Sequence, residues 1–276
     1  MIEIVFDKSY LDGASTTEVR DVCSRFSALM PQELFFEMIT TRPESQRRCF
    51  SKLPDQDSPV ALIPPVGVLV DFERQHQEAC VPLARHRVDS NRYVFNRRLR
   101  EGTFVPSADD SAHLAAWQSQ VDSDTRAFVA TSLAVSDVFP DLSKLRHSDL
   151  PAAVEKKRRM VATDSDFVRR IYAAGAPADA PPAARIDPRW AVFRVFQCRM
   201  LSALRMFGRH QGAMPHPVGT EFWTRAEHTM LDLYGLILGT LAGGFATLEN
   251  ELQQEFVLLC PDATPLARGL LGHAEG

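Results

Sequence analysis

Four acidic residues stand where the sequence predicts elements that meet at one edge of a sheet. Asp7 follows the apolar and β-branched run 2–6, which is typical of a short buried strand. Glu249 follows a second apolar run, residues 245–247. Because ligands bind at the carboxyl ends of the strands in open parallel sheets, both carboxylates are expected at that edge.

The other two acids, Asp232 and Glu37, lie inside predicted helices. Asp232 interrupts the apolar segment 230–237, where a carboxylate is costly unless it is paired or binds a metal ion. Glu33 and Glu37 are four residues apart in the apolar run 31–41, so they share one helix face. Carboxylate oxygens without matching basic partners are the ligands that Mg²⁺ and Mn²⁺ prefer.

Each acid also has a purely structural explanation. Asp7 could cap the turn that follows it, Asp232 could pair with an arginine, and Glu37 could be a solvated helix residue. The hypothesis of a metal site therefore depends on the order of the four acids along the chain, rather than on any one of them.

Several common classes of active site are disfavoured because their motifs are absent. The eight histidines show no HxH, HExxH or HxxxH spacing, and the chain has no GxSxG, GxxxxGK[ST] or GxGxxG sequence. A dehydrogenase or an acyl hydrolase is therefore unexpected. The five cysteines are scattered without a CxxC pair, which argues against a disulfide framework or a structural zinc site and favours a reducing compartment.

Length and composition are those of a globular protein. The 276 residues allow one large domain or two small ones, and 45% hydrophobic with 24% charged residues exclude a disordered chain. The amino terminus lacks the basic and apolar regions of a signal peptide, and the longest apolar stretch, 230–242, is too short to span a bilayer. We therefore expect a soluble, cytoplasmic protein with no membrane partner.

The net charge of −4 is unevenly distributed along the chain. Residues 85–100 carry a net +5 and residues 151–210 a net +7, so the remainder carries −16. Two basic segments predict contact with the phosphates of a nucleic acid at the edges of the acidic site, although solvated helix faces give the same pattern. The residues predicted to bind nucleic acid are Arg85, Arg97, Arg98, Arg100, Lys156, Lys157, Arg158 and Arg159.

The elements that must position these side chains form β-α-β patterns at both ends of the chain, which favours a mostly parallel sheet. Helical signals dominate the middle. In chain order, the predicted elements are strand 2–6, a turn at 12–14, a helix from Thr16 behind the capping box Ser15–Glu18, an extended segment 28–30, helix 31–41, a loop at 44–57, a helix behind Ser107, a loop at 173–184, a buried helix 190–207, helix 221–241, strand 245–247, helix 250–256 and strand 257–260.

Three stretches of the chain resemble the PIN-domain family of metal-dependent nucleases. IVFDKSYL is similar to the family's first strand, in which an Asp is followed two residues later by Ser, Thr or Asn; the matching residues are Asp7 and Ser9. MPQELFFEMIT is similar to the segment after the second strand, where a Glu precedes a short apolar end. That Glu is matched by Glu37, with Glu33 as the other register.

The third stretch, HTMLDLYGLILGTLAGGFATLENEL, resembles the unit that closes the family's fold. There an Asp on a helix, here Asp232, precedes a strand that ends in Thr-x-Asp, here Thr247 and Glu249. Glu249 departs from the family's usual Asp. The PDATPL tail resembles the family's last strand. The resemblance covers roughly residues 1–45 and 220–266, at the two ends of the chain.

The resemblance implies a fold class, α/β, with a three-layer α/β/α arrangement around a short, mostly parallel sheet. The whole chain, 1–276, would be a single PIN-like domain built from about 1–70 and 190–266. The middle of the chain is longer than a compact PIN domain. Residues 75–189 are therefore expected to form a large helical insertion or an elaborated helical layer.

The resemblance also implies a reaction. Asp7, Glu37, Asp232 and Glu249 would hold one or two Mg²⁺ or Mn²⁺ ions, and Ser9 and Thr247 would support them. Such ions activate water and neutralise charge on a phosphate, so the expected activity is phosphodiester hydrolysis by an endoribonuclease, with single-stranded RNA favoured. The alternatives are a non-catalytic PIN-like module that binds RNA or a protein partner, and a toxin-type nuclease that a partner protein silences. A homo-oligomer is also open.

Overall fold

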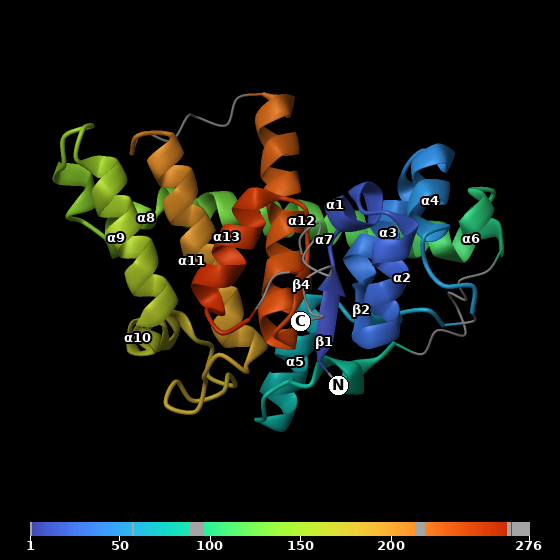
Figure 1. Cartoon of the computed structure of the whole chain (residues 1–276). Coiled ribbons are helices and arrows are strands. Elements are labelled where there is room, and N and C mark those ends of the chain that lie inside the picture. The colour runs from blue at the N-terminus through green and yellow to red at the C-terminus, as the bar shows by residue number, and fades with distance from the viewer. Residues whose placement is uncertain (1, 57, 89–96, 213–218, 264–265, 267–276) are drawn as a thin grey trace, which may run out of the picture.

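The sheet of this protein has four strands, all parallel, in the order β3-β2-β1-β4 (Figure 1). The computed structural model describes residues 2–56, 58–88, 97–212, 219–263 and 266. Leu266 adds a single parallel bridge to Ala246. The predicted α/β class with a short parallel sheet is confirmed. The strands are β1 (Glu3–Phe6), β2 (Ser27–Pro31), β3 (Ala61–Ile63) and β4 (Phe245–Ala246).

Side chains that alternate between the two faces of the sheet build two separate cores. Val5, Leu29 and Ile63 belong to the core on one face, whereas Ile4 and Met30 belong to the core on the other. The strands are mostly apolar because parallel sheets are covered by helices on both sides. The result is the three-layer α/β/α arrangement that the sequence predicts.

One face of the sheet is covered by the short helices of the first third of the chain and by α6. In Figure 1 these helices lie to the right of β1. Their apolar residues share the core that contains Ile4 and Met30. They are α1 (Lys8–Gly13), α2 (Thr16–Arg25), α3 (Gln32–Thr40), α4 (Pro43–Phe50) and α6 (Arg97–Glu101).

The other face is covered by the longer helices, most of which share the core that contains Val5. Among the described residues between 77 and 190, all regular elements are helical. The elements of this side are α5 (Val66–His76), η1 (Leu83–His86), α7 (Ala108–Leu133), α8 (Val135–Val138), η3 (Leu142–Lys144), α9 (Leu150–Thr163), α10 (Ser165–Gly175), α11 (Ala191–Arg209), α12 (Thr220–Ala242) and α13 (Asn250–Leu259).

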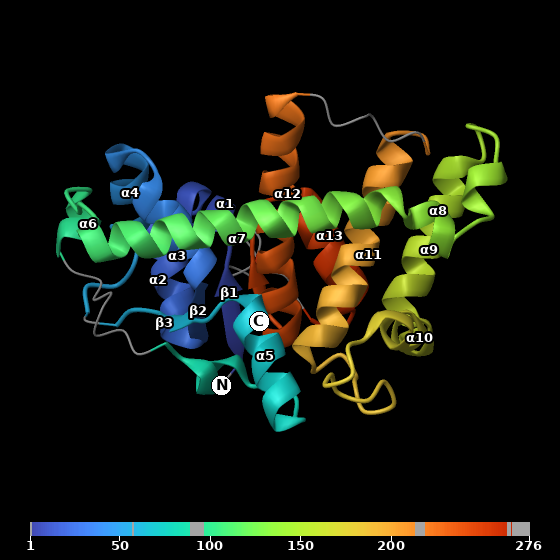
Figure 2. The same ribbon diagram turned by 180° about the vertical axis from the view of Figure 1, so that it is seen from behind.

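The long helix α7 connects the two ends of the molecule. Figure 2 shows it running across α3, α12 and α11, from α6 on one side to α8 on the other. It begins at a capping box, in which the Ser107 hydroxyl accepts a hydrogen bond from Asp110 N over 3.2 Å. Val121 and Phe128 are buried against the neighbouring helices. The predicted helix behind Ser107 is therefore confirmed.

Three sequence predictions are wrong, each for a local reason. The turn at 12–14 belongs to α1, because Asp7 acts as the N-cap of a helix that starts at Lys8. The loop at 44–57 contains α4, which starts at Pro43, a residue suited to the first helical turn. The strand 257–260 does not form. Its residues continue α13 instead, because Leu252, Phe256 and Leu259 are buried at helical spacing.

The chain turns sharply between α12 and β4 at two glycines. One adopts a left-handed backbone conformation, and the other lies very close to a neighbouring strand. Gly243 ends α12 in the left-handed conformation at φ +75°. Gly244 lies so close to β1 that a Cβ atom would stand 2.5 Å from the carbonyl oxygen of Glu3. This close approach allows β4 to pair with β1, so that strands from the first and last described parts of the chain lie side by side. Within the described part of the chain, every helix is too short or too polar to cross a membrane.

Candidate functional site

A cavity of about 210 Å³ lies at the carboxyl end of β1. All four predicted metal ligands line it, although they come from both ends of the sequence. We call it the acidic cavity, since its lining contains six Asp or Glu residues and one lysine. Its lining residues are Phe6, Asp7, Lys8, Ser9, Asp12, Pro31, Glu33, Leu34, Glu37, His228, Leu231, Asp232, Tyr234, Gly235 and Glu249.

Asp7 is held in one orientation by a set of hydrogen bonds to a single oxygen. Its Oδ2 accepts from Ser9 N over 3.2 Å, from the Ser9 hydroxyl, and from Thr247 Oγ1 over 2.9 Å. The other oxygen, Oδ1, accepts no hydrogen bond from the described residues. Asp7 therefore presents one free oxygen from a fixed carboxylate.

Ser9 and Thr247 also connect Asp7 to the segment that carries Glu249. The Ser9 hydroxyl accepts a hydrogen bond from Leu248 N over 3.0 Å. Thr247 is fully buried, and its Oγ1 accepts from Glu249 N over 3.2 Å. The two residues that the resemblance assigns to a supporting role thus contact both acid-bearing segments.

Asp232 and Glu249 are carboxylates without a partner. Neither side chain makes a hydrogen bond or an ion pair with any residue that the structure describes. Burial, followed by the charges of Glu249 and Asp7, raises the pKa of Asp232 to about 8. Burial and the charge of Asp7 also raise the pKa of Glu249. The acids therefore destabilise one another's charged forms, as like charges close to one another do.

Glu37 differs from the other three predicted ligands because it already has a cationic partner. Lys8 Nζ donates to Glu37 Oε1 over 2.6 Å. Both residues line the acidic cavity. The lysine follows Asp7 directly in the sequence, so the ion pair brings the beginning of α1 to the side of α3.

The donor set of the cavity fits a hard divalent cation in its chemistry. All four predicted ligands are carboxylates, and two of them have no described partner. Their present arrangement is not a finished coordination shell: in the described part of the chain, no group of three or more His, Cys, Asp or Glu side chains is placed so that it could hold a metal ion. Binding would require rearrangement, including release of Glu37 from Lys8.

Glu33, the other register for the α3 ligand, has a structural contact. Its Oε1 accepts from Val66 N, the first residue of α5, over 3.3 Å, while its Oε2 has no hydrogen-bond partner. Burial raises the pKa of Glu33 to about 7. Since Glu33 also lines the acidic cavity, it lies between the start of α5 and the four predicted ligands.

Among the charged and histidine side chains that line the cavity, three were not singled out from the sequence. Lys8 and Asp12 were missed because α1 was read as a turn. His228 lies four residues before Asp232 on α12 and lines the same cavity. The spacing of four on a predicted helix was the signal that could have found it, because such residues share one face.

The structure brings none of the eight predicted nucleic-acid-binding residues to the acidic cavity. Arg85 follows Ala84, whose N–H donates to Glu3 at the opposite end of β1. Residues 97–100 lie on α6, and residues 156–159 lie on α9. Part of the first basic segment, 89–96, lies outside the described residues. Many of these cations have acidic partners, for example Lys157 with Asp141 at 2.8 Å.

Comparison with known proteins adds no assignment. The chain matches no protein-family model, no curated protein and no solved structure. The functional argument therefore rests on the acidic cavity and on the residues that surround it.

Proposed function

We propose that this protein is a metal-dependent nuclease that hydrolyses phosphodiester bonds, with single-stranded RNA as its favoured substrate and Mg²⁺ or Mn²⁺ as its cofactor. The observation that carries the proposal is the partnerless carboxylate of Asp232, enclosed with Asp7, Glu37 and Glu249 around one cavity. The resemblance of the same residues to the PIN-domain pattern supports it.

A divalent ion in this cavity would activate a water molecule and neutralise the charge that develops on the scissile phosphate. Asp7, Glu37 and Asp232 would hold the ion, and Glu249 would contribute from the exposed side. Hydrogen bonds from Thr247 and Ser9 to Oδ2 fix the orientation of the Asp7 carboxylate. Lys8, once released from Glu37, places an ammonium group where it can contact a phosphate oxygen.

The alternative without catalysis has one observation in its favour. The Lys8–Glu37 ion pair at 2.6 Å neutralises one predicted ligand, and a salt bridge of this kind also stabilises a cavity that never binds metal. The cavity would then have no catalytic role, and the protein would be a module that binds RNA or a protein.

Calorimetry with Mn²⁺, paired with cleavage assays, separates these two functions. We expect wild-type protein to bind Mn²⁺ and to cleave single-stranded RNA with Mg²⁺ or Mn²⁺ but not with EDTA. Single-stranded DNA and duplexes serve as comparison substrates. Asp7→Asn, Glu37→Gln and Asp232→Asn should each lower cleavage by more than about 100-fold, because the amide removes a charged ligand. Glu249→Ala should cost less.

Glu33→Gln is the matched control, since it removes a carboxylate from the same cavity on the same helix as Glu37. It should leave cleavage within about threefold of the wild type. If wild-type protein binds no Mn²⁺ at millimolar concentration, or if Asp7→Asn cleaves as fast as the wild type, the nuclease proposal fails. The non-catalytic module then becomes the better account.

A further inference from the structure

A second cavity, of about 410 Å³, lies between α11 and the first turns of α12. Three arginines and one glutamate line it, so its charge is opposite to that of the acidic cavity. We call it the arginine groove. Its lining residues are Ser202, Arg205, Met206, Arg209, His210, Gly219, Glu221, Phe222, Arg225, Ala226 and Thr229.

The arginine groove adjoins the acidic cavity along α12. Thr229 lines the groove, and Asp232, three residues later, lines the acidic cavity. Residues three apart on a helix lie on neighbouring turns of the same face. Arg205 also lies close to the acid-bearing segment, since its Nη1 donates to Glu251, two residues after Glu249, over 3.1 Å. A chain of phosphates could therefore pass from one cavity to the other.

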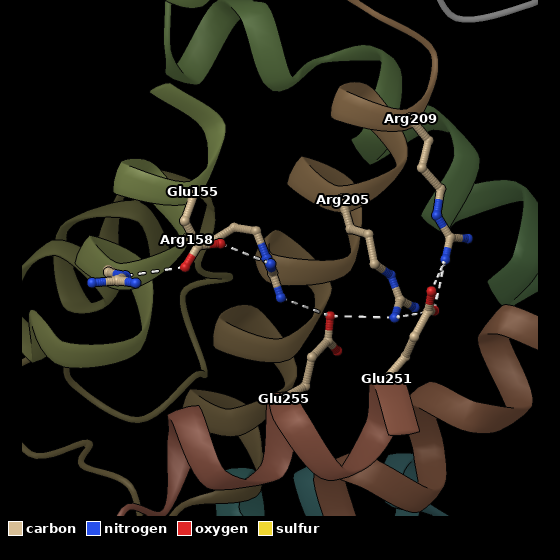
Figure 3. A network of polar contacts seen from close by, with 7 residues as sticks. Glu155, Arg158, Arg205, Arg209, Glu251 and Glu255 are labelled. Carbon is tan, nitrogen blue, oxygen red and sulfur yellow. Dashed lines mark hydrogen bonds and ion pairs between the residues drawn. The ribbon is translucent and has the colours of Figure 1, made fainter. Parts of the chain in front are cut away.

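The arginines of the groove are held in place by acidic residues at its edge. Figure 3 shows Arg205 and Arg209, both from α11, reaching toward Glu251 on α13. Arg209 Nη2 donates to the two oxygens of Glu251 over 2.5 and 2.6 Å, and Arg205 Nη1 donates to it over 3.1 Å. Behind them, the buried Glu255 lies 3.4 Å from Arg205 and 3.3 Å from Arg158 (Figure 3).

The third arginine belongs to α12. Arg225 pairs with Glu221 one turn earlier, and both side chains are largely exposed. The amino end of α12 also faces the groove, since Gly219 and Phe222 line it. No described side chain caps this end. Free N–H groups at a helix start favour anions, as do guanidinium groups, which match the geometry of phosphate oxygens.

We infer that the arginine groove binds the backbone phosphates of the nucleic acid strand on one side of the cleavage site. This inference rests on the proposed nuclease function. The acidic cavity alone repels a polyanion, so a strand must be held by cations nearby. The guanidinium groups of Arg209 and Arg225 can exchange a carboxylate partner for a phosphate, because both acids that hold them, Glu251 and Glu221, are solvent-exposed.

The test uses the two ion pairs Arg209–Glu251 and Arg225–Glu221, and replaces first the arginine and then the glutamate of each pair. Binding of a labelled single-stranded RNA of about 12 nucleotides is measured by fluorescence anisotropy in EDTA, so that no cleavage occurs. Arg209→Gln and Arg225→Gln should each weaken binding about 3- to 10-fold and lower the salt slope by about 0.7. Glu251→Gln and Glu221→Gln should tighten binding, because each frees an arginine.

A purely structural role predicts a different result, since both members of a pair would then change RNA binding in the same direction. That outcome overturns the inference. Arg25→Gln on α2, which covers the opposite face of the sheet, is the matched control, because it breaks an exposed ion pair four residues apart, as Arg225→Gln does. If it weakens binding as much as Arg209→Gln, the inference is likewise wrong.

Mn²⁺ calorimetry and cleavage assays test the nuclease proposal separately from the groove inference. If the wild type binds Mn²⁺ and cleaves RNA while the arginine variants bind RNA normally, the groove inference fails and the proposed function stands. If the arginine variants lose RNA binding while the wild type neither binds Mn²⁺ nor cleaves, the groove is supported as a nucleic-acid site and the nuclease proposal fails.

Discussion

Thr247 donates a hydrogen bond from its hydroxyl to Oδ2 of Asp7 over 2.9 Å, although 240 positions separate the two residues. The bond is possible because β4 pairs in parallel with β1, so that both strands end at the same edge of the sheet. Thr247 is fully buried and Asp7 is partly buried. The contact therefore connects the segments that follow β1 and β4 at the point where the proposed metal ion would bind.

Removing that hydroxyl should impair the site more than the fold. Thr247→Val keeps the shape of the side chain but removes one of the three hydrogen bonds to Asp7 Oδ2 and the acceptor of Glu249 N, so we expect a loss of about 1–3 kcal/mol in the free energy of unfolding. Mn²⁺ affinity and cleavage should fall about tenfold. Thr247→Ser, which keeps the hydroxyl, should restore Mn²⁺ affinity. Equal losses in the two variants would contradict this role.

The carboxylate of Asp232 should destabilise the metal-free protein at alkaline pH. Its pKa is about 8 in the folded state, well above the usual value near 4, so the folded protein binds this proton more tightly than the unfolded chain does. The contribution of this group to the free energy of unfolding is fully present below about pH 4 and is lost as the pH rises through about 8. Asp232→Asn should therefore raise the melting temperature at pH 8.5 in EDTA, and much less at pH 5.

Mn²⁺ provides the control for this effect. A bound cation replaces the proton as the partner of Asp232, so Mn²⁺ should stabilise the wild type at pH 8.5 and leave Asp232→Asn unchanged. Differential scanning calorimetry measures both melting temperatures. A wild type that is more stable than Asp232→Asn in EDTA at pH 8.5 would show that the carboxylate has a partner.

The carboxylate of Glu33 should also destabilise the folded protein as the pH rises, but over a lower pH range than Asp232. Burial raises its pKa to about 7, so the folded state loses the contribution of this group between about pH 4.5 and 7. Glu33→Gln keeps an oxygen for Val66 N and carries no charge. We expect it to stabilise the protein by about 2–3 kcal/mol at pH 8, with little effect at pH 5. Urea unfolding at the two pH values measures the difference.

Glu73 should be essential to the fold and irrelevant to the chemistry. It is fully buried on α5, and its carboxylate accepts from Cys80 N at 3.1 Å, Ala191 N at 2.6 Å and Val192 N at 2.9 Å. It thereby satisfies the first N–H groups of α11. Glu73→Gln places an NH₂ group against those donors and should cost about 2–4 kcal/mol of unfolding free energy.

Glu78→Gln is the matched control for Glu73→Gln. Glu78 is exposed, and its ion pair with Arg85, at 3.5 Å, is accessible to solvent. It should change unfolding by no more than about 0.5 kcal/mol. Guanidinium titration at constant pH measures both variants. A Glu73→Gln protein as stable as the wild type would show that the cap of α11 is supplied by other groups.

Much of the acidic cavity could be predicted from the sequence because its acidic residues follow local signals. An acid after an apolar strand, as at Asp7, or inside an apolar helix, as at Asp232, is visible without coordinates. The elements on which these residues lie are confirmed. The wrong predictions also have local causes: α1 and α4 are short helices of 6 and 8 residues, and the apolar end of α13 has the composition of a strand.

The sequence by itself determined the α/β class, the parallel sheet and the order of the acids, because strand and helix periodicities are properties of neighbouring residues. Only the tertiary structure decided which charges meet. Lys8 pairs with Glu37, Arg209 pairs with Glu251, and none of the predicted basic residues 97–100 and 156–159 lines the cavity. Ion pairs form across helices that pack only in the folded chain, and no local pattern encodes which partner a long charged side chain will reach.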